Sequence, residues 1–328
     1  MSTSLSYVAG APSHIVARRA QRRAQLRRRR LGALGGGLAL VVLIVAVLIV
    51  TAHRGRGATT RSTATGEGHA ARRHSSQTFN TTNGAPGSSS TVETVGSTEI
   101  QRLLQLGLPI YCAGPRGNAV AFTFDDGPGP YTYLALRKLT QAGERATFFV
   151  VGRSLDNYPG YLPRELKVAA IGDHTYTHPV LAQLPAGLVS SEIGRTKQKI
   201  EGESGQPVNF FRPPYGSRNT TVDQIAQSLG LVEILWSVDS ADSLGANYAG
   251  IIKNVEAGLH PGAIILMHEN RGQTIRALTT LLPELHRRHL RSVSLPQLFA
   301  ADPPSTAQVR RGEAGCGGSA ALAPGTGN

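Results

Sequence analysis

Short apolar runs alternate with longer helical patterns between residues 119 and 295, and this alternation constrains the fold more than any other feature. Gly or Pro stands at most of the junctions, as at Gly143 and Gly205. The runs expected to form strands are Ala119–Phe124, Ala146–Val151, Ala169–Gly172, Asn209–Arg212, Leu231–Val238, Ala263–Met267 and Ser292–Leu295. The expected helices are Tyr131–Ala142, Tyr161–Ala169, Ala186–Glu203, Thr221–Leu229, Tyr248–Leu259 and Thr274–His289. Strand–helix alternation builds a parallel sheet with helices outside, so the sequence predicts an α/β fold whose seven or so strands form a barrel or an incomplete barrel.

Polar side chains follow five of these strands at the points where the strands end. They are Asp125 and Asp126; His174 and His178; Arg212, followed by Pro213, Pro214, Tyr215 and Gly216; Asp239 and Asp242; and His268. In parallel barrels the chemistry collects at the carboxyl ends of the strands. We therefore expect these residues to meet on one rim of the barrel.

Two of these groups have the composition of a metal site. His174 and His178, with one of the two Asp residues, would supply three ligands and leave a position open for water or substrate. Zinc suits this set, and Co²⁺, Mn²⁺ or Ni²⁺ are alternatives. The other Asp would stand beside the metal, where a general base is needed. Taken singly, the segment TFDDGP (residues 123–128) could be a turn, and the two His could be a pair on a helix face or a loop.

Arg212 and His268 extend the predicted site. An Arg at a strand end beside buried carboxylates is expected to pair with one of them, although a solvated surface cation is the alternative. His268 follows an apolar strand and suits a general acid oriented by Asp242. A core imidazole bonded to a backbone carbonyl is the other interpretation of His268.

Five short motifs follow one another as they do in the polysaccharide deacetylase family, and residues 115–300 resemble its NodB-homology domain. The motifs are TFDDGP, HTYTHP, RPPYG, WSVDSADS and ILMH. The resemblance implies a distorted (β/α) barrel and metal-dependent removal of acetyl groups from N-acetylated sugars. It also implies roles for the matching residues: Asp125 as general base; Asp126, His174 and His178 as metal ligands; Arg212 as the tether of the base; the Tyr215 N–H as oxyanion donor; Asp242 and His268 as the acid dyad; and Leu266 as the wall of the acetyl-methyl pocket.

The fourth motif departs from the family pattern. The residue after Asp242 is usually Trp, which forms one wall of the substrate groove, and here it is Ser243. The only Trp, Trp236, lies inside the preceding expected strand. The departure leaves the metal chemistry intact and bears on substrate preference.

The chain divides by composition into five parts. They are a cytoplasmic Arg-rich arm (1–30), a transmembrane anchor (31–52), a disordered linker (53–98), the deacetylase-like domain (99–301) and a flexible tail (302–328). Residues 31–52 carry no charge and are long enough for a helix of roughly 33 Å, which spans a bilayer core. The eight Arg before them place the domain outside the cytoplasm in a single-pass cell-membrane protein. A cleaved signal peptide is the alternative.

The charge and the cysteine content limit which partners and which covalent links the chain can have. The net charge is +13, but residues 102–300 hold 19 Lys and Arg against 16 Asp and Glu, a difference of only +3, so no nucleic-acid partner is expected. Cys112 and Cys316 bracket the domain and could form a disulfide in an oxidising exterior, or remain two free thiols.

The anchor and tether favour a cell-wall substrate. We expect deacetylation of N-acetylglucosamine or N-acetylmuramic acid in peptidoglycan, with a chitooligosaccharide or an exopolysaccharide as alternatives. Two other classes stay open: a non-catalytic glycan-binding module on the same fold, and a non-haem iron oxygenase, because two His and a carboxylate also bind iron.

Overall fold

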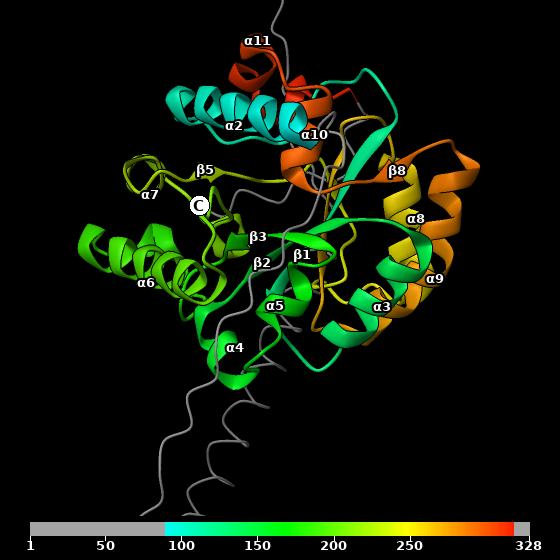
Figure 1. The fold of residues 1–328 in the computed structure, drawn as a ribbon, viewed down its shortest axis with the longest axis horizontal. Helices are drawn as coiled ribbons and strands as arrows, with labels where there is room; N and C mark the ends of the chain where they lie inside the picture. The colour runs from blue at the N-terminus through cyan, green and yellow to red at the C-terminus, as the bar shows by residue number, and fades with distance from the viewer. Residues whose placement is uncertain (1–88, 318–328) are drawn as a thin grey trace, which may run out of the picture. The chain divides into compact units, whose positions relative to one another are not determined.

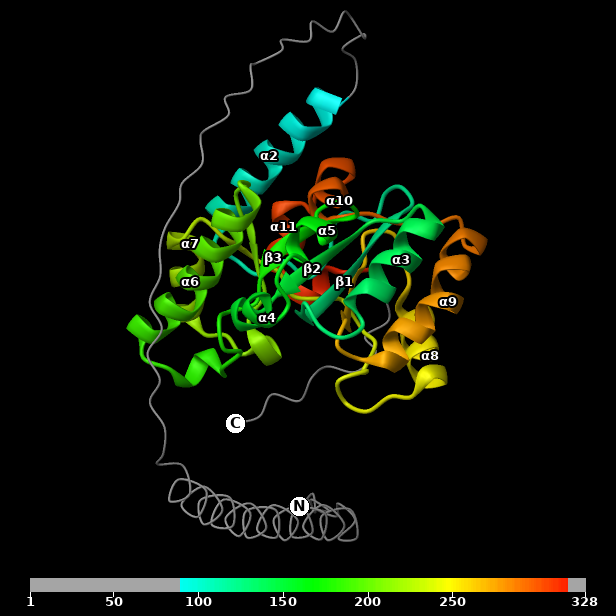
Figure 2. The same cartoon turned by 60° about the horizontal axis from the view of Figure 1, so that its bottom comes forward.

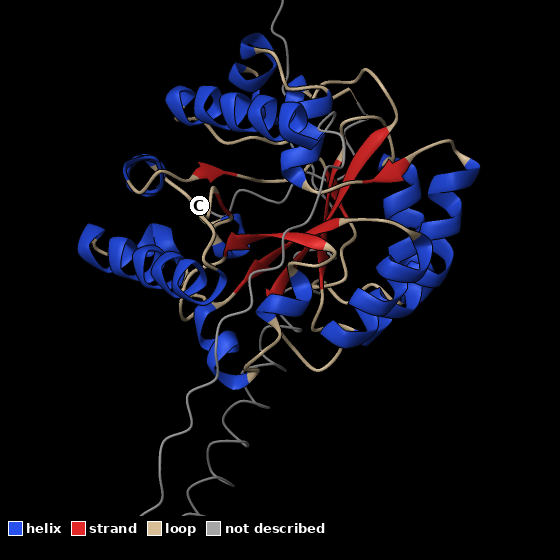
Figure 3. Cartoon of the chain, viewed as in Figure 1, coloured by secondary structure: helices blue, strands red, loops and turns tan. Residues whose placement is uncertain are grey.

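The computed structural model describes residues 89–317, with side chains from residue 98 onward. Pairings between its strands are all parallel and helices cover the sheet, which confirms the predicted α/β class (Figures 1 and 3). The described strands are β1 (Ala119–Gly127), β2 (Ala146–Val150), β3 (Ala169–Asp173), β4 (Phe210–Phe211), β5 (Val232–Glu233), β6 (Val238–Asp239), β7 (Ile264–His268) and β8 (Arg291–Ser292).

The strands form an incomplete barrel. Seven of them follow the order β5-β4-β3-β2-β1-β7-β6, and β8 pairs with β1. The end strands β5 and β6 are neighbours in the chain, yet no pairing joins them in this part of the molecule. The prediction of one continuous strand over Leu231–Val238 was therefore wrong. The carbonyls of Ile234 and Leu235 accept hydrogen bonds from the buried Arg212 guanidinium, at 3.2 and 3.1 Å, where a continuous strand would pair with a neighbour.

Residues 110–113 run from the end of β5 to the start of β7. The Ile110 N–H donates to the Glu233 carbonyl at 2.9 Å, and the Ile110 carbonyl accepts from the Leu235 N–H at 2.8 Å. On the other side, the Ala113 N–H donates to the Gly262 carbonyl at 2.8 Å. Backbone that precedes the first strand thus supplies bonds that a closed barrel would obtain from another strand.

The helices surround the sheet. They are α2 (Ser89–Leu106), α3 (Thr132–Ala142), α4 (Gly152–Asn157), α5 (Leu162–Glu165), α6 (Ala186–Ser204), α7 (Thr220–Ser228), α8 (Tyr248–Gly258), α9 (Gly272–Arg287), α10 (Leu295–Ala301) and α11 (Thr306–Arg310), with 3-10 turns η1 (Leu181–Gln183), η2 (Pro214–Gly216) and η3 (Gly312–Gly315). Five of the six expected helices begin and end within two residues of these bounds. Both α3 and α6 end at a glycine in the left-handed conformation, Gly143 at φ 68° and Gly205 at φ 67°. The expected helix Tyr161–Ala169 was too long: the structure has only α5 there, because β3 already begins at Ala169.

Because successive side chains of a strand point to opposite faces of the sheet, the buried apolar side chains form two clusters. Phe122 and Phe124 of β1 face outward and pack with side chains of α3, α6 and α9. Ala121 of β1 faces the interior, where it packs with residues of α2 and α10, among them Leu103 and Phe299. Figures 1 and 2 show α2 and α10 side by side at one end of the sheet.

Neither α2 nor α10 was predicted. The start of α2 at Ser89 lies inside the segment expected to be linker. The apolar residues Ile100, Leu103 and Leu104 stand at helical spacing near the end of α2, but they follow a Ser-, Thr- and Gly-rich stretch that was taken for linker. In the structure Ile100 and Leu103 are buried in the interior cluster.

The C-terminal segment differs from the flexible tail that was predicted over residues 302–328. Residues 302–317 contain α11 and η3, and the Cys112–Cys316 disulfide, whose Cα atoms are 5.9 Å apart, ties them to the start of the domain. The Gln308 side chain donates to the Ala113 carbonyl at 2.8 Å, and Val309 is buried. These anchors are single residues in a Pro-, Gly- and Ala-rich context, so composition did not indicate them. The predicted disulfide is confirmed, and residues 318–328 lie outside the described part.

The predicted arm, membrane anchor and most of the linker also lie outside the described residues. Among the helices of residues 89–317, none is long and apolar enough to cross a bilayer.

Candidate active site

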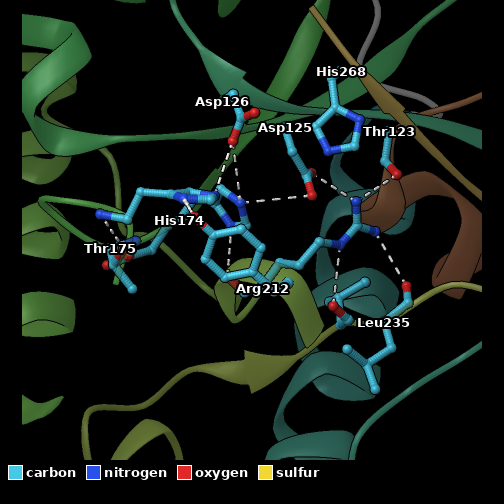
Figure 4. A network of polar contacts seen from close by, with 12 residues as sticks. Thr123, Asp125, Asp126, His174, Thr175, Arg212, Leu235 and His268 are labelled. Carbon is cyan, nitrogen blue, oxygen red and sulfur yellow. Dashed lines mark hydrogen bonds and ion pairs between the residues drawn. The ribbon is translucent and has the colours of Figure 1, made fainter. Parts of the chain in front are cut away.

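The two carboxylates at the end of β1 reach the same side of the sheet because the strand is irregular there. Successive residues of a strand point to opposite faces, so Asp125 and Asp126 would normally diverge. The register of β1 against β2 shifts between Asp125 and Gly127, and Asp126 has φ 73°. This bulge turns the Asp126 carboxylate toward the rim, beside that of Asp125 (Figure 4).

Two imidazoles approach Asp126 from the loop after β3. His174 Nδ1 lies 2.6 Å from the Arg212 carbonyl oxygen, and His178 Nδ1 lies 3.1 Å from the Tyr215 hydroxyl. The opposite ring atoms face the carboxylate: His178 Nε2 is 3.1 Å and His174 Nε2 is 3.7 Å from Asp126 Oδ1. The bonds at Nδ1 therefore present both Nε2 atoms to one point, as in histidines that bind metals.

The three predicted metal ligands fit a divalent ion. One ligand atom from each of Asp126, His174 and His178 lies within 4.8 Å of the other two. Asp126 Oδ1 is buried and faces the two Nε2 atoms, without a further hydrogen-bond partner among the described residues. Burial opposes ionisation of Asp126, but the imidazoles of His178, His174 and His268 hold its pKa well below the usual range. Burial lowers the pKa of His174, which favours the neutral ring that a metal requires.

Arg212 is fully buried and holds the Asp125 carboxylate. Its Nη1 donates to Asp125 Oδ1 and to Thr123 Oγ1, both at 2.8 Å (Figure 4). Its guanidinium carbon lies 4.2 Å from the centre of the Phe149 ring. The carbonyls of Ile234 and Leu235 accept two further bonds from the guanidinium. The predicted pairing of Arg212 with a carboxylate is present.

Asp242 and His268 form the predicted dyad. His268 Nδ1 lies 2.6 Å from Asp242 Oδ1, and the His268 N–H donates to Asp242 Oδ2 at 2.8 Å. Burial lowers the pKa of His268, but the Asp242 carboxylate outweighs it and raises the pKa to about 9. In the sheet, His268 is the direct partner of Asp125 across β1 and β7. The acid and base candidates therefore stand next to each other, each held by its own partner.

A comparison with known proteins gives the family. The sequence profile of the polysaccharide deacetylase family matches residues 113–234. A protein of Bacillus cereus named peptidoglycan-N-acetylglucosamine deacetylase is 34% identical over 194 residues, which cover 57% of this chain and 70% of the relative. The chain belongs to the polysaccharide deacetylase family. The predicted class of enzyme, a hydrolase acting on non-peptide carbon–nitrogen bonds, agrees with this membership.

Other members of the family give similar results. A chitooligosaccharide deacetylase of Bradyrhizobium is 34% identical over 197 residues, which cover 55% of this chain and 90% of the relative. The solved structure of a family 4 carbohydrate esterase from Streptomyces lividans, in complex with acetate, is 36% identical with a TM-score of 0.54. The alignment covers 58% of this deacetylase chain and 99% of that one.

The remaining predicted residues of the deacetylase site lie on the same rim. Tyr215 is 69% exposed and has φ 61°, and its hydroxyl contacts His178. Leu266 pairs with Thr123 across β7 and β1, two residues before His268 and on the same face. Trp236 lies beside Gly216 of the RPPYG loop and does not follow Asp242, so it does not take the place of the family Trp at Ser243.

Sequence reasoning missed three polar residues that hold the site. Thr274 Oγ1 donates to Asp242 Oδ2 at 2.6 Å, Thr123 Oγ1 accepts from Arg212, and Asn270 Nδ2 donates to Asp126 Oδ2 at 3.1 Å. Asn270 follows His268 by two residues, so its position after a strand end was a usable signal. Thr123 begins the TFDDGP motif, but the motif does not indicate its bond to Arg212, and nothing in the local sequence distinguishes Thr274 from an ordinary helix residue.

A pair of buried carboxyl groups behind the site was also missed. Glu165 of α5 and Glu269, which follows β7, are both completely buried. Glu269 accepts a hydrogen bond from Thr132 Oγ1, whereas neither oxygen of Glu165 has a hydrogen-bond partner among the described residues. Burial raises the pKa of Glu165 to about 8. Burial, together with the nearby Glu165 carboxyl, raises the pKa of Glu269 well above its usual value.

Proposed function

We propose that this enzyme removes acetyl groups from the N-acetylated amino sugars of peptidoglycan by metal-dependent hydrolysis. The observation that carries the proposal is the pairing of Asp125 with His268 across β1 and β7, beside Asp126, His174 and His178. A carboxylate held by Arg212 and an imidazole held by Asp242 are suited to act as base and acid on one substrate.

Asp126, His174 and His178 would hold the metal, which would polarise the acetamide carbonyl and lower the pKa of a water when bound. Arg212 occupies Asp125 Oδ1, so Oδ2 is the atom that accepts a proton from the water as its oxygen attacks the carbonyl carbon. The Tyr215 N–H stabilises the negative charge on the carbonyl oxygen.

His268 then supplies the second proton. Its Nδ1 is held by Asp242, which leaves Nε2 to protonate the sugar nitrogen as the carbon–nitrogen bond breaks. The pKa of about 9 keeps this imidazole protonated near neutral pH. The products are acetate and a free amino sugar.

The substrate is supported by the name of the Bacillus cereus relative and by the uncharged segment 31–52. We propose that this segment anchors the chain in the cell membrane, with the catalytic domain outside the cytoplasm. The Cys112–Cys316 disulfide is consistent with an oxidising location. A chitooligosaccharide substrate is a second candidate, because the Bradyrhizobium relative carries that name.

The test is acetate release by the full chain, stripped of metal and then reloaded with zinc, from purified peptidoglycan and from N-acetylglucosamine oligomers. Zinc-dependent release is expected, faster on peptidoglycan. Asp125→Asn should abolish release and retain zinc. Faster release from the oligomers would favour a chitooligosaccharide substrate. Zinc binding without acetate release from either substrate would indicate a glycan-binding module.

A further inference from the structure

The loop that carries both histidine ligands has an unusual pattern of backbone hydrogen bonds. Four consecutive amides, those of residues 175–178, donate to side-chain oxygens. Thr175 N–H donates to Asp173 Oδ1 at 2.7 Å, and His178 N–H donates to Thr175 Oγ1 at 3.1 Å. The two amides between them, of Tyr176 and Thr177, donate to Glu192 Oε2 at 3.1 and 2.7 Å.

Glu192 differs from the other two acceptors because it comes from another element. Asp173 and Thr175 belong to the loop or to the strand just before it, whereas Glu192 lies on α6. Its second oxygen, Oε1, accepts a further bond from Thr177 Oγ1 at 2.9 Å. One carboxylate therefore makes three hydrogen bonds to the two residues that immediately precede His178.

The loop needs such an anchor because its conformation is unfavourable. Thr175 has φ 65° and His178 has φ 62°, in the left-handed region that residues with a Cβ rarely adopt. Each such residue costs on the order of 1 kcal/mol and persists only where its surroundings fix it. Gly152 and Arg153 donate to the loop carbonyls of Thr175 and Tyr176, but the amides next to His178 depend on Glu192.

We propose that Glu192 is a positioning residue for the metal site: it holds the loop in the strained conformation that directs His178 Nε2 toward Asp126 Oδ1. Without Glu192 the loop relaxes, His178 Nε2 no longer remains 3.1 Å from that oxygen, and affinity for the metal falls. The inference rests on the proposed metal site and does not depend on which glycan is deacetylated.

The experiment measures the zinc dissociation constant of the full chain by competition with a chelator, and the unfolding midpoint of the metal-free protein. Glu192→Ala should weaken zinc binding by about 10-fold, the lower end of the loss seen when a direct partner of a metal ligand is removed, because Glu192 bonds the two residues before His178 and not the ligand itself. Glu192→Asp, whose side chain is one methylene shorter, should lose several-fold in zinc affinity. It is the test variant if the alanine variant fails to fold. Glu192→Gln should stay within about threefold of wild type, because its amide oxygen can accept both backbone bonds and its NH₂ can donate to Thr177 Oγ1.

The control is Glu203→Gln on the same helix, since Glu203 is exposed and pairs only with Lys199 among the described residues. Its zinc affinity should match wild type. Unchanged affinity in both Glu192→Ala and Glu192→Asp overturns the inference. So does a loss in Glu203→Gln as large as in Glu192→Ala, which would indicate a general effect on α6. Failure of the wild type itself to bind zinc would instead contradict the proposed function.

Discussion

Replacing Glu165 by Gln should stabilise the protein at alkaline pH. The Glu165 carboxyl is completely buried without a hydrogen-bond partner among the described residues, and its pKa rises from 4.5 to about 8. The folded protein therefore binds a proton at Glu165 that the unfolded chain releases above about pH 4.5. A raised carboxyl pKa destabilises the fold increasingly as pH rises from the unfolded value to the folded one, and has no effect below both.

The magnitude follows from the two pKa values. Each unit of difference corresponds to about 1.4 kcal/mol, so the penalty grows by roughly 3 kcal/mol between about pH 5 and pH 8. Gln has nearly the same shape and does not ionise, so it removes this penalty. The neighbouring Glu269 remains in both proteins, and its pKa, which the Glu165 carboxyl helps to raise, should fall in the variant and add to the gain.

The assay is urea unfolding of the metal-free wild type and Glu165→Gln at a series of pH values. The free energy of unfolding of the variant minus that of the wild type should be small near pH 5 and rise toward about 3 kcal/mol near pH 8. Glu203→Gln, the same substitution at an exposed position, is measured alongside as the matched control. A difference that stays constant with pH would refute the reasoning, because it would mean that Glu165 ionises equally in both states.

Three further predictions concern the site and the tail. Asp242→Asn should move the alkaline limb of the pH profile of kcat/KM downward by about one unit or more, because the Asp242 carboxylate raises the His268 pKa to about 9; an unmoved limb would contradict the acid role. Arg212→Met should lower the free energy of unfolding by about 3–5 kcal/mol in urea, since it leaves the buried Asp125 carboxylate unpaired, and a change below about 1 kcal/mol would refute the pairing. Cys316→Ser should lower the free energy of unfolding by about 3 kcal/mol without changing zinc affinity, and loss of zinc binding would show that the tail supports the site directly.

The sequence predicted the parts of the fold that depend on local pattern. Strands such as Ala146–Val150 are short apolar runs, and helices such as α6 end at glycine, so both could be read along the chain. The site residues could be predicted because Asp125, His174 and His268 stand at strand ends that meet on one rim. In contrast, the division of Leu231–Val238 depends on Arg212, which lies some 20 residues earlier in the chain. Neither that long-range contact nor the partner of Glu192 leaves a local pattern.

The position of α2 affects the order in which the parts of the domain can fold. Leu103 of α2 and Phe299 of α10 belong to the same interior cluster, although nearly the whole domain separates them in the chain. All the strands precede α10 in the chain, so they are synthesised before the helix that covers part of their inner apolar surface. The interior cluster that contains Leu103 of α2 can therefore be completed only after α10 has been made. A protein trimmed to residues 113–234, the part that matches the family profile, would retain Asp125, Asp126 and the two histidines of the proposed metal site, but it would lose α2 and α10 together with β7 and His268.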